Sequence, residues 1–189
     1  MKEHPILFSA PMVRAILDGS KTQTRRVWKM PRGCMWYEAM GGEREGWFID
    51  PGQPWWPHVG ECRCPYGVPG DRLWVREAWR RDIFDHEKTL YRATHGDRTV
   101  FDKWKPSIHM PRVRSRITLE VTGVRVERLQ DISKADARAE GVRSNADTLA
   151  ETGYADARFA YRSLWETING AGSWDANPWV WVVEFRKLP

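Results

Sequence analysis

An alternation of apolar and polar residues between Arg114 and Leu129 constrains the fold more than any other stretch of the sequence. In RSRITLEVTGVRVERL, apolar residues occupy every second position up to Val121, and the alternation resumes after Gly123 with two valines. A period of two residues is typical of a β-strand that buries one face. Gly123 interrupts the period, so we expect a bend or bulge there. The chain therefore has to build a sheet around one long strand.

Shorter elements are expected on both sides of this strand. Start and stop signals predict one helix from Pro11 to Gly19 and another from Ser133 to Gly141. A third helix is predicted over Asp156–Ile168, with an apolar stripe of Ala157, Tyr161, Leu164 and Ile168. Further strands are predicted over Pro5–Ser9, within Gly70–Trp79, over TLYRAT, from Val27–Trp28 and over Pro178–Phe185. Short strands with interposed helices predict an α+β fold, a small β-barrel flanked by short helices.

Residues 30–69 break this regularity. The segment is dense in glycine and proline, which predicts turns and at most short strands such as GWFI. It also holds four of the 12 tryptophans, whose rings serve cores, interfaces and base-stacking surfaces alike. We expect an irregular insertion within a single domain that spans residues 1–189.

Composition limits the classes of function. Lys and Arg exceed Asp and Glu by 30 to 25, and the net charge of +5 favours an anionic partner such as nucleic acid. No apolar run is long enough for a membrane span or an export signal. Three cysteines are an odd number, which makes a disulfide framework unlikely and a reducing cytoplasm the expected location.

The stretch DGSKTQTRR (Asp18–Arg26) concentrates positive charge and hydroxyl groups in an expected loop behind the first helix. A Thr24 hydroxyl becomes a nucleophile when a base takes its proton, and Lys21 can serve if burial or a neighbouring cation lowers its pKa. Arg25 and Arg26 suit a phosphate or an oxyanion. The alternative is a solvated basic turn in which Thr24 bonds to backbone.

Glu77 is the acid that sequence reasoning adds to this set. By the two-residue period it lies on the same strand face as the apolar Leu73 and Val75. A carboxylate in line with core residues requires a strand end or a specific partner. Glu77 is therefore the predicted group that orients Lys21 or carries a proton to a leaving amine.

Two further clusters have a functional and a plain interpretation. Lys105, Arg112, Arg114 and Arg116 would share one face of a strand, forming either a ridge for a phosphate backbone or a solvated face. Cys34, His58, Cys62 and Cys64 are weak zinc ligands by spacing, because one residue between paired cysteines is unusual. We therefore expect free thiols and no cofactor, with zinc as the alternative.

Several segments together resemble the ASCH domain of the PUA-like superfamily, in the longer form common in phages and prophages. They are ILDGSKTQTRR, CPYGVPGDRLWVREAW, SRITLEVTGVRVERLQDIS with the following ARAEGV, and NPWVWVVEF. The resemblance covers nearly the whole chain except Met30–Glu61. It implies a β-barrel with a cleft beside the first helix and a nucleic acid or nucleoside as ligand.

Some small bacterial ASCH proteins are amidohydrolases that remove the acetyl group from 4-N-acetylcytidine with a Lys, a Thr three residues later and a distant Glu. Lys21 and Thr24 match the first two, and Glu77 is our candidate for the third. The resemblance thus favours amide hydrolysis of an acylated cytidine. The alternatives are a ribonuclease that uses the same basic cleft and a non-catalytic reader of RNA or modified bases.

Overall fold

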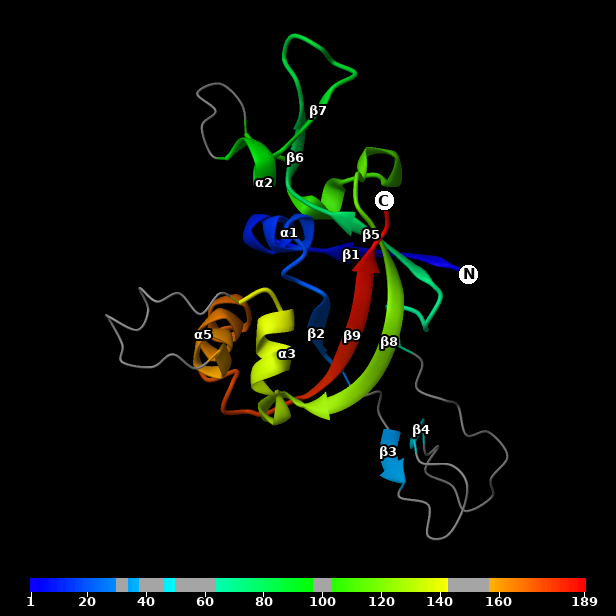
Figure 1. The fold of residues 1–189 in the computed structure, drawn as a ribbon, viewed down its shortest axis with the longest axis vertical. Coiled ribbons are helices and arrows are strands. Elements are labelled where there is room, and N and C mark those ends of the chain that lie inside the picture. Colours follow the sequence, from blue (N-terminus) through cyan, green and yellow to red (C-terminus); the bar gives the residue numbers. More distant parts are fainter. Residues whose placement is uncertain (30–33, 38–45, 50–63, 97–102, 143–156) are drawn as a thin grey trace.

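The computed structural model describes residues 1–29, 34–37, 46–49, 64–96, 103–142 and 157–189. It confirms the mixed α+β class: a curved five-stranded sheet is covered by helices (Figure 1). In spatial order the strands are β1 (Glu3–Leu7), β5 (Arg72–Arg76), β8 (Thr118–Arg128), β9 (Trp179–Lys187) and β2 (Gln23–Val27). The β1–β5 pair is parallel and the other pairs are antiparallel. Within the described residues the sheet is open, with β1 and β2 as its edges.

The long strand predicted from the alternation is β8. Its register against β9 shifts between Val121 and Gly123, which confirms the bulge expected at the glycine. A Cβ atom at Gly123 would lie 2.7 Å from a carboxylate oxygen of Glu184 on β9, so glycine permits the close approach of the two strands. The segment before Thr118 is not strand, because a 3₁₀ turn occupies Arg112–Arg114.

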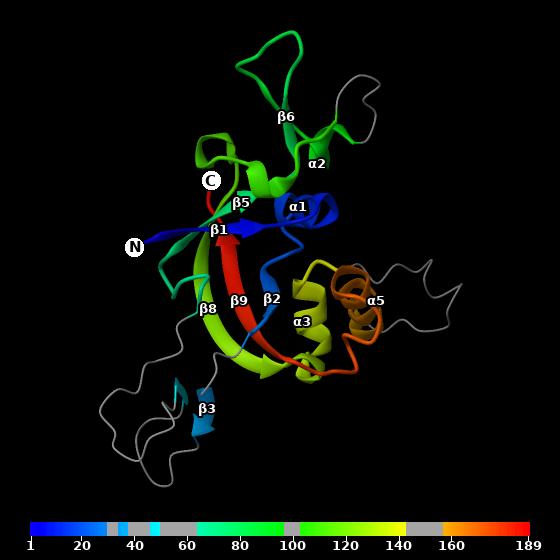
Figure 2. The same cartoon turned by 180° about the vertical axis from the view of Figure 1, so that it is seen from behind.

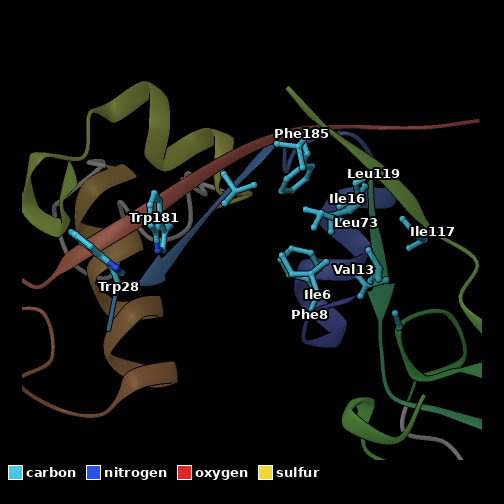
Figure 3. Packing of buried hydrophobic residues seen from close by; sticks show 14 residues of the cluster. Ile6, Phe8, Val13, Ile16, Trp28, Leu73, Ile117, Leu119, Trp181 and Phe185 are labelled. Carbon is cyan, nitrogen blue, oxygen red and sulfur yellow. The ribbon is translucent and has the colours of Figure 1, made fainter. Parts of the chain in front are cut away.

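Strand β9 separates two apolar clusters. Trp181, Val183 and Phe185 belong to the first core cluster, whereas Val180 and Val182 belong to the second. In the first cluster the ring centroids of Phe8 and Phe185 lie 6.1 Å apart, while Trp28 and Trp181 pair further along the sheet at 5.5 Å (Figure 3). Because both faces of β9 are buried, its sequence is a near-continuous apolar run rather than an alternation.

The helices are α1 (Ala10–Leu17), α2 (Arg92–His95), α3 (Lys134–Ala139) and α5 (Ala157–Asn169). Helix α3 begins at a capping box in which Ser133 and Asp136 exchange hydrogen bonds, and Gly141 follows its end in a left-handed conformation, as predicted. Helix α5 buries Ala157, Tyr161 and Trp165. The predicted stripe is thus partly wrong, because Ile168 is 52% exposed and Trp165 takes the buried position.

Two hairpins extend from the sheet. Strands β6 (Trp79–Arg81) and β7 (Thr89–Tyr91) form an arm that, with α2, projects beyond α1 (Figure 2). Strands β3 (Cys34–Tyr37) and β4 (Gly46–Ile49) pair within the expected insertion, which confirms GWFI as a strand. The predicted strand TLYRAT is half right, since its second part is α2.

Two expectations about basic segments are wrong. Residues 23–27 of the expected loop form the edge strand β2, which ends where a strand was expected to begin. Residues 105–116 contain two 3₁₀ turns, at Ser107–His109 and Arg112–Arg114, in place of a strand. Proline at positions 106 and 111 precedes each turn and withholds the backbone donors that a strand would need. No helix of the described part is both long and apolar enough to cross a membrane.

Candidate functional site

A cavity of about 150 Å³ lies beside the edge strand β2. A cavity of this volume accommodates a six-membered ring. Strand β2 and Glu140 provide a polar wall, and the start of α1 and the buried side of α5 provide a largely apolar one. The lining residues are Leu7, Ser9, Met12, Thr24, Arg25, Arg26, Val27, Glu140, Tyr161, Leu164, Trp165, Ile168 and Asn169. We call this space the first cavity.

Glu140 of the polar wall forms an ion pair with Lys21, which does not itself line the cavity. The Lys21 Nζ donates to the Glu140 carboxylate at 2.7 Å and to the Glu140 backbone carbonyl at 2.9 Å. The side chains of Lys21 and Glu140 are 0% and 3% exposed. Backbone bonds hold the two residues together, because Lys21 and Glu140 form an isolated β-bridge and the Thr22 amide donates to Ala139. The ion pair is therefore held in place by the backbone of the fold, and it does not depend on the conformation of a flexible side chain.

The surroundings of Lys21 change its protonation. Burial holds the pKa of Lys21 below its ordinary value, and the neighbouring Arg26 and Arg25 cations act in the same direction, whereas Glu140 opposes them. The condition under which a lysine can act as a base, burial beside other cations, is therefore met at this position.

Arg25 is an anchor and not a free cation. Its side chain is fully buried and its guanidinium meets three carboxylates: Glu127 at 2.9 Å, Asp136 at 3.4 Å and Glu140 at 3.5 Å. Arg125 on β8 joins the same network through Glu127, Asp136 and Glu184. A network of this kind offsets the cost of removing charge from water and holds Glu140 in place.

Thr24 and Arg26 face the first cavity from neighbouring positions on β2. No described residue hydrogen-bonds to the Thr24 hydroxyl, although the residue is buried. Arg26 donates to the Leu7 carbonyl and stacks on the Phe8 ring at 5.2 Å, while its buried Nε has no acceptor among the described residues. The cavity wall thus offers an unengaged hydroxyl beside a guanidinium that retains donor capacity.

Tyr161 of α5 completes the polar lining. Burial raises its pKa well above the ordinary value, and the nearby Glu140 charge adds to the effect. The phenol therefore stays protonated at any ordinary pH and is a hydrogen-bond donor. No described residue takes that hydrogen bond. Tyr161 is thus available to a ligand in the first cavity.

The structure does not bring Glu77 to this site. Glu77 is 2% exposed, follows the end of β5, and accepts two hydrogen bonds from Arg116 at 2.8 and 3.0 Å. It does not line the first cavity, where Glu140 is the carboxylate that contacts Lys21. The sequence argument that Glu77 needs a strand end or a partner is confirmed, and the partner is Arg116.

The predicted basic ridge is not continuous. Arg112 forms a bidentate pair with Glu3, Arg114 donates to Thr89 and to the Glu87 carbonyl, and Arg116 holds Glu77. The ammonium of Lys105 lies over the Trp79 ring at 5.1 Å. The three arginines therefore tie separate parts of the chain together instead of presenting one charged face.

The proposed zinc ligands fall mainly outside the described residues. His58 and Cys62 lie there, and the side chain of Cys34 is not described. Cys64 is a free, half-buried thiol whose pKa is raised by burial. Among the described residues no group of three His, Cys, Asp or Glu side chains is arranged to hold a metal ion.

Sequence reasoning missed Glu140, Tyr161 and the α5 wall. A signal for Glu140 exists: it caps the C-terminal end of α3, where the helix dipole disfavours a negative charge. An acid at that end of a helix, directly before a glycine stop, indicates a cationic partner elsewhere. Leu164 and Ile168 were predicted on the apolar stripe of α5, and periodicity identifies an apolar face without saying whether that face borders a core or a cavity.

Comparison with known proteins adds no identification, since the chain matches no protein-family model, no curated protein and no solved structure.

Proposed function

We propose that the protein is an amidohydrolase that removes an acyl group from the exocyclic nitrogen of a cytidine-like ring. The observation that carries the proposal is the unengaged Thr24 hydroxyl at the wall of a ring-sized cavity, which Glu140 of the buried Lys21–Glu140 pair also lines. The ASCH resemblance, with its PUA-like barrel, belongs to the same proposal. The resemblance is supported by the K-x-x-T spacing. In the proposed site Glu140 takes the place of Glu77 as the carboxylate.

The reaction runs in two steps. Lys21, as the neutral amine, takes the proton of the Thr24 hydroxyl, and the oxygen bonds to the acyl carbon. Arg26 donates to the oxyanion of the tetrahedral intermediate. The carbon–nitrogen bond then breaks, and the protonated Lys21 returns the proton to the leaving amine. Water hydrolyses the acyl ester of Thr24 and releases the acid and the free enzyme.

Each remaining side chain has a place in this scheme. Glu140 orients the Lys21 amine and stabilises its ammonium form, and Arg25 holds Glu140. Leu164, Trp165 and Ile168 supply an apolar surface for the ring, against which a flat heterocycle loses water at little cost. The Tyr161 hydroxyl is a donor for a ring carbonyl oxygen.

A ribonuclease receives less support from the same observations. A nuclease cleft needs cations along the phosphate chain, yet the ridge arginines are engaged with Glu3, Thr89 and Glu77. A non-catalytic reader remains an outcome of the test below, because the same cavity would hold a base without turning it over.

The test measures release of acetate and cytidine from 4-N-acetylcytidine by the wild type, Thr24→Ala, Glu140→Gln and Glu77→Gln. Thr24→Ala and Glu140→Gln are expected to lower kcat by about a hundredfold or more, as removal of a nucleophile or its base system does. Glu77→Gln is the matched control, because it makes the same change as Glu140→Gln at the acid that the sequence favours. It is expected to keep kcat within about twofold at temperatures where the variant is folded.

Each result has a defined meaning. Full activity in Thr24→Ala would remove Thr24 as the nucleophile. Loss of kcat in Glu77→Gln with activity retained in Glu140→Gln would return the catalytic role to Glu77. Binding of the substrate to the wild type without turnover would replace the hydrolase by a reader of the modified base.

A further inference from the structure

A second, larger cavity lies on the other side of the segment that leads into α1. Its volume is about 550 Å³, within the range of sites that bind whole small molecules. It is lined by Phe8, Ser9, Ala10, Pro11, Arg14, Ala78, Arg92, Gly96, Trp104, Pro106 and Ser107. None of these lining residues is acidic, and two are arginines. The cavity therefore suits an anion.

Two donors in this second cavity have unused capacity. Arg14 donates one hydrogen bond, from Nη1 to the Ala93 carbonyl at 3.3 Å, and a guanidinium has five N–H groups. The indole Nε1 of Trp104 is buried and has no acceptor among the described residues. An unpaired buried N–H group costs free energy until a ligand or water supplies an acceptor. Phosphate oxygens are the acceptors that the Arg14 guanidinium favours.

The second cavity also offers an aromatic surface. Trp104 lines it, and the guanidinium of Arg80 lies 5.4 Å from the Trp104 ring, so the indole is positioned by a cation contact. Aromatic rings beside cations are the usual support for the bases of single-stranded nucleic acids. An anion carrying a flat ring is therefore the ligand class that fits.

The two cavities are neighbours. Ser9 lines both. Phe8, Ala10 and Pro11 next to it line the second cavity, and Leu7 and Met12 just beyond them line the first. A ligand with one ring in the first cavity therefore reaches the second cavity, because only a few residues of the protein separate the linings of the two. Cavities in this arrangement suit two consecutive units of one polymer.

Building on the proposed function, we propose that the second cavity binds the phosphate and base of the nucleotide next to the acylated one. The substrate is then a single-stranded oligonucleotide and not a free nucleoside. Arg14 contacts the phosphate, the Trp104 ring supports the base, and the first cavity receives the acylated ring. The arm residues around β6 and α2 thereby serve specificity and take no part in the chemistry.

The experiment separates binding from turnover. Fluorescence anisotropy gives the Kd of a labelled RNA pentanucleotide with a central 4-N-acetylcytidine, over a salt series, and competition gives the Kd values of 4-N-acetylcytidine and its 5′-monophosphate. The proteins are the wild type, Arg14→Gln, Trp104→Phe and, as a control with equal loss of charge outside both cavities, Arg186→Gln. The glutamine keeps a donor for Ala93 and the phenylalanine keeps a ring, and circular dichroism checks folding.

We expect the wild type to bind the pentanucleotide at least about tenfold more tightly than the nucleoside. Arg14→Gln should weaken pentanucleotide binding about tenfold and lower the salt slope by about one, and Trp104→Phe should weaken it several-fold. Nucleoside affinity should stay within about twofold in both variants, and Arg186→Gln should match the wild type.

Three outcomes would overturn the proposal: equal wild-type affinity for pentanucleotide and nucleoside, equal affinity for the monophosphate and the pentanucleotide, or unchanged pentanucleotide affinity in both cavity variants. The proposed hydrolysis can fail separately, since absence of turnover leaves these Kd values measurable. Binding of the pentanucleotide through Arg14 without acetate release would keep the second cavity and remove only the amidohydrolase.

Discussion

Lys21 is a cation held in a place where burial works against its charge. Glu140 accepts from its ammonium, but Arg25 and Arg26 lie close enough to act against protonation. The balance leaves the pKa of Lys21 below the ordinary value of 10.5, with burial as the largest cause. At the residue scale, burial makes the charged form of Lys21 unfavourable. A lysine that acts as a base requires a pKa lowered in this way.

This balance predicts how stability depends on pH. The pKa of Lys21 is lower in the folded than in the unfolded chain, so between those two values the unfolded chain binds more protons. The free energy of unfolding should therefore rise with pH through that window, up to about 10.5, whereas below the folded pKa the cost of the buried charge is present in full. Urea denaturation at several alkaline pH values measures this.

The variant Lys21→Met removes the titrating group while keeping the length of the side chain. The difference in unfolding free energy between wild type and Lys21→Met should grow in favour of the wild type as pH rises. A difference that stays constant, or that shrinks with rising pH, would show that the pKa of Lys21 is not lowered in the folded chain.

At the element scale the end of α3 is the feature that positions the site. Gly141 follows the helix with φ of +81°, and a Cβ atom there would lie 2.8 Å from the Ala15 Cβ and 2.9 Å from the Lys21 Cβ. Helix α3, helix α1 and Lys21, two residues before β2, thus meet at one point that has room for glycine alone. The approach brings Glu140 to Lys21.

Gly141→Ala should therefore lower the free energy of unfolding for two separate reasons. The left-handed conformation costs about 1 kcal/mol for alanine, and the overpacking adds about 2 kcal/mol. Gly19→Ala is the matched control, because Gly19 has φ of +80° and no heavy atom within 4 Å of its would-be Cβ. Chemical denaturation of both variants isolates the packing cost. Equal losses in the two variants would mean that the three elements do not meet closely at Gly141.

At the scale of the whole molecule, β9 joins the two apolar clusters. Its successive side chains enter the first and the second core cluster alternately, so neither cluster can lose its order without disturbing the strand. Both walls of the site depend on β9. Strand β2 of the polar wall pairs with β9, and the second cluster, to which β9 contributes, packs beneath α3 and α5. Folding and site assembly are thus coupled.

We expect one cooperative unfolding transition. Val182→Ala and Val183→Ala remove the same two methyl groups from opposite faces, and each should lower the free energy of unfolding by about 2 kcal/mol. Transitions followed by tryptophan fluorescence and by far-ultraviolet circular dichroism should coincide in the wild type and in both variants. Separate transitions, with each variant shifting a different one, would show that the clusters unfold independently.

Local pattern predicted a large part of the fold. The alternation before Val121 gave β8, Gly123 gave its bulge, and the signals at Ser133 and Gly141 gave both ends of α3. The failures have physical causes: TQTRR is polar because an edge strand lies against charged partners, and the polar side chains hide its period from a hydrophobicity argument. Leu164 and Ile168 were predicted on an apolar stripe, and only the structure shows that they line a cavity, because a cavity wall and a core look alike in sequence.

The sequence by itself determined most of the elements of this protein and half of its candidate site, because caps, turns and periodicity depend on residues a few positions apart, and Lys21 and Thr24 belong to one short motif. Only the tertiary structure decided which acid meets Lys21. Glu140 lies 119 positions away, and although its place before the Gly141 stop indicates a cationic partner, nothing local says which basic residue that partner is. Strand order and the close packing at Gly141 bring Glu140 to the lysine and leave Glu77 with Arg116, since a contact across that separation depends on how the elements pack together.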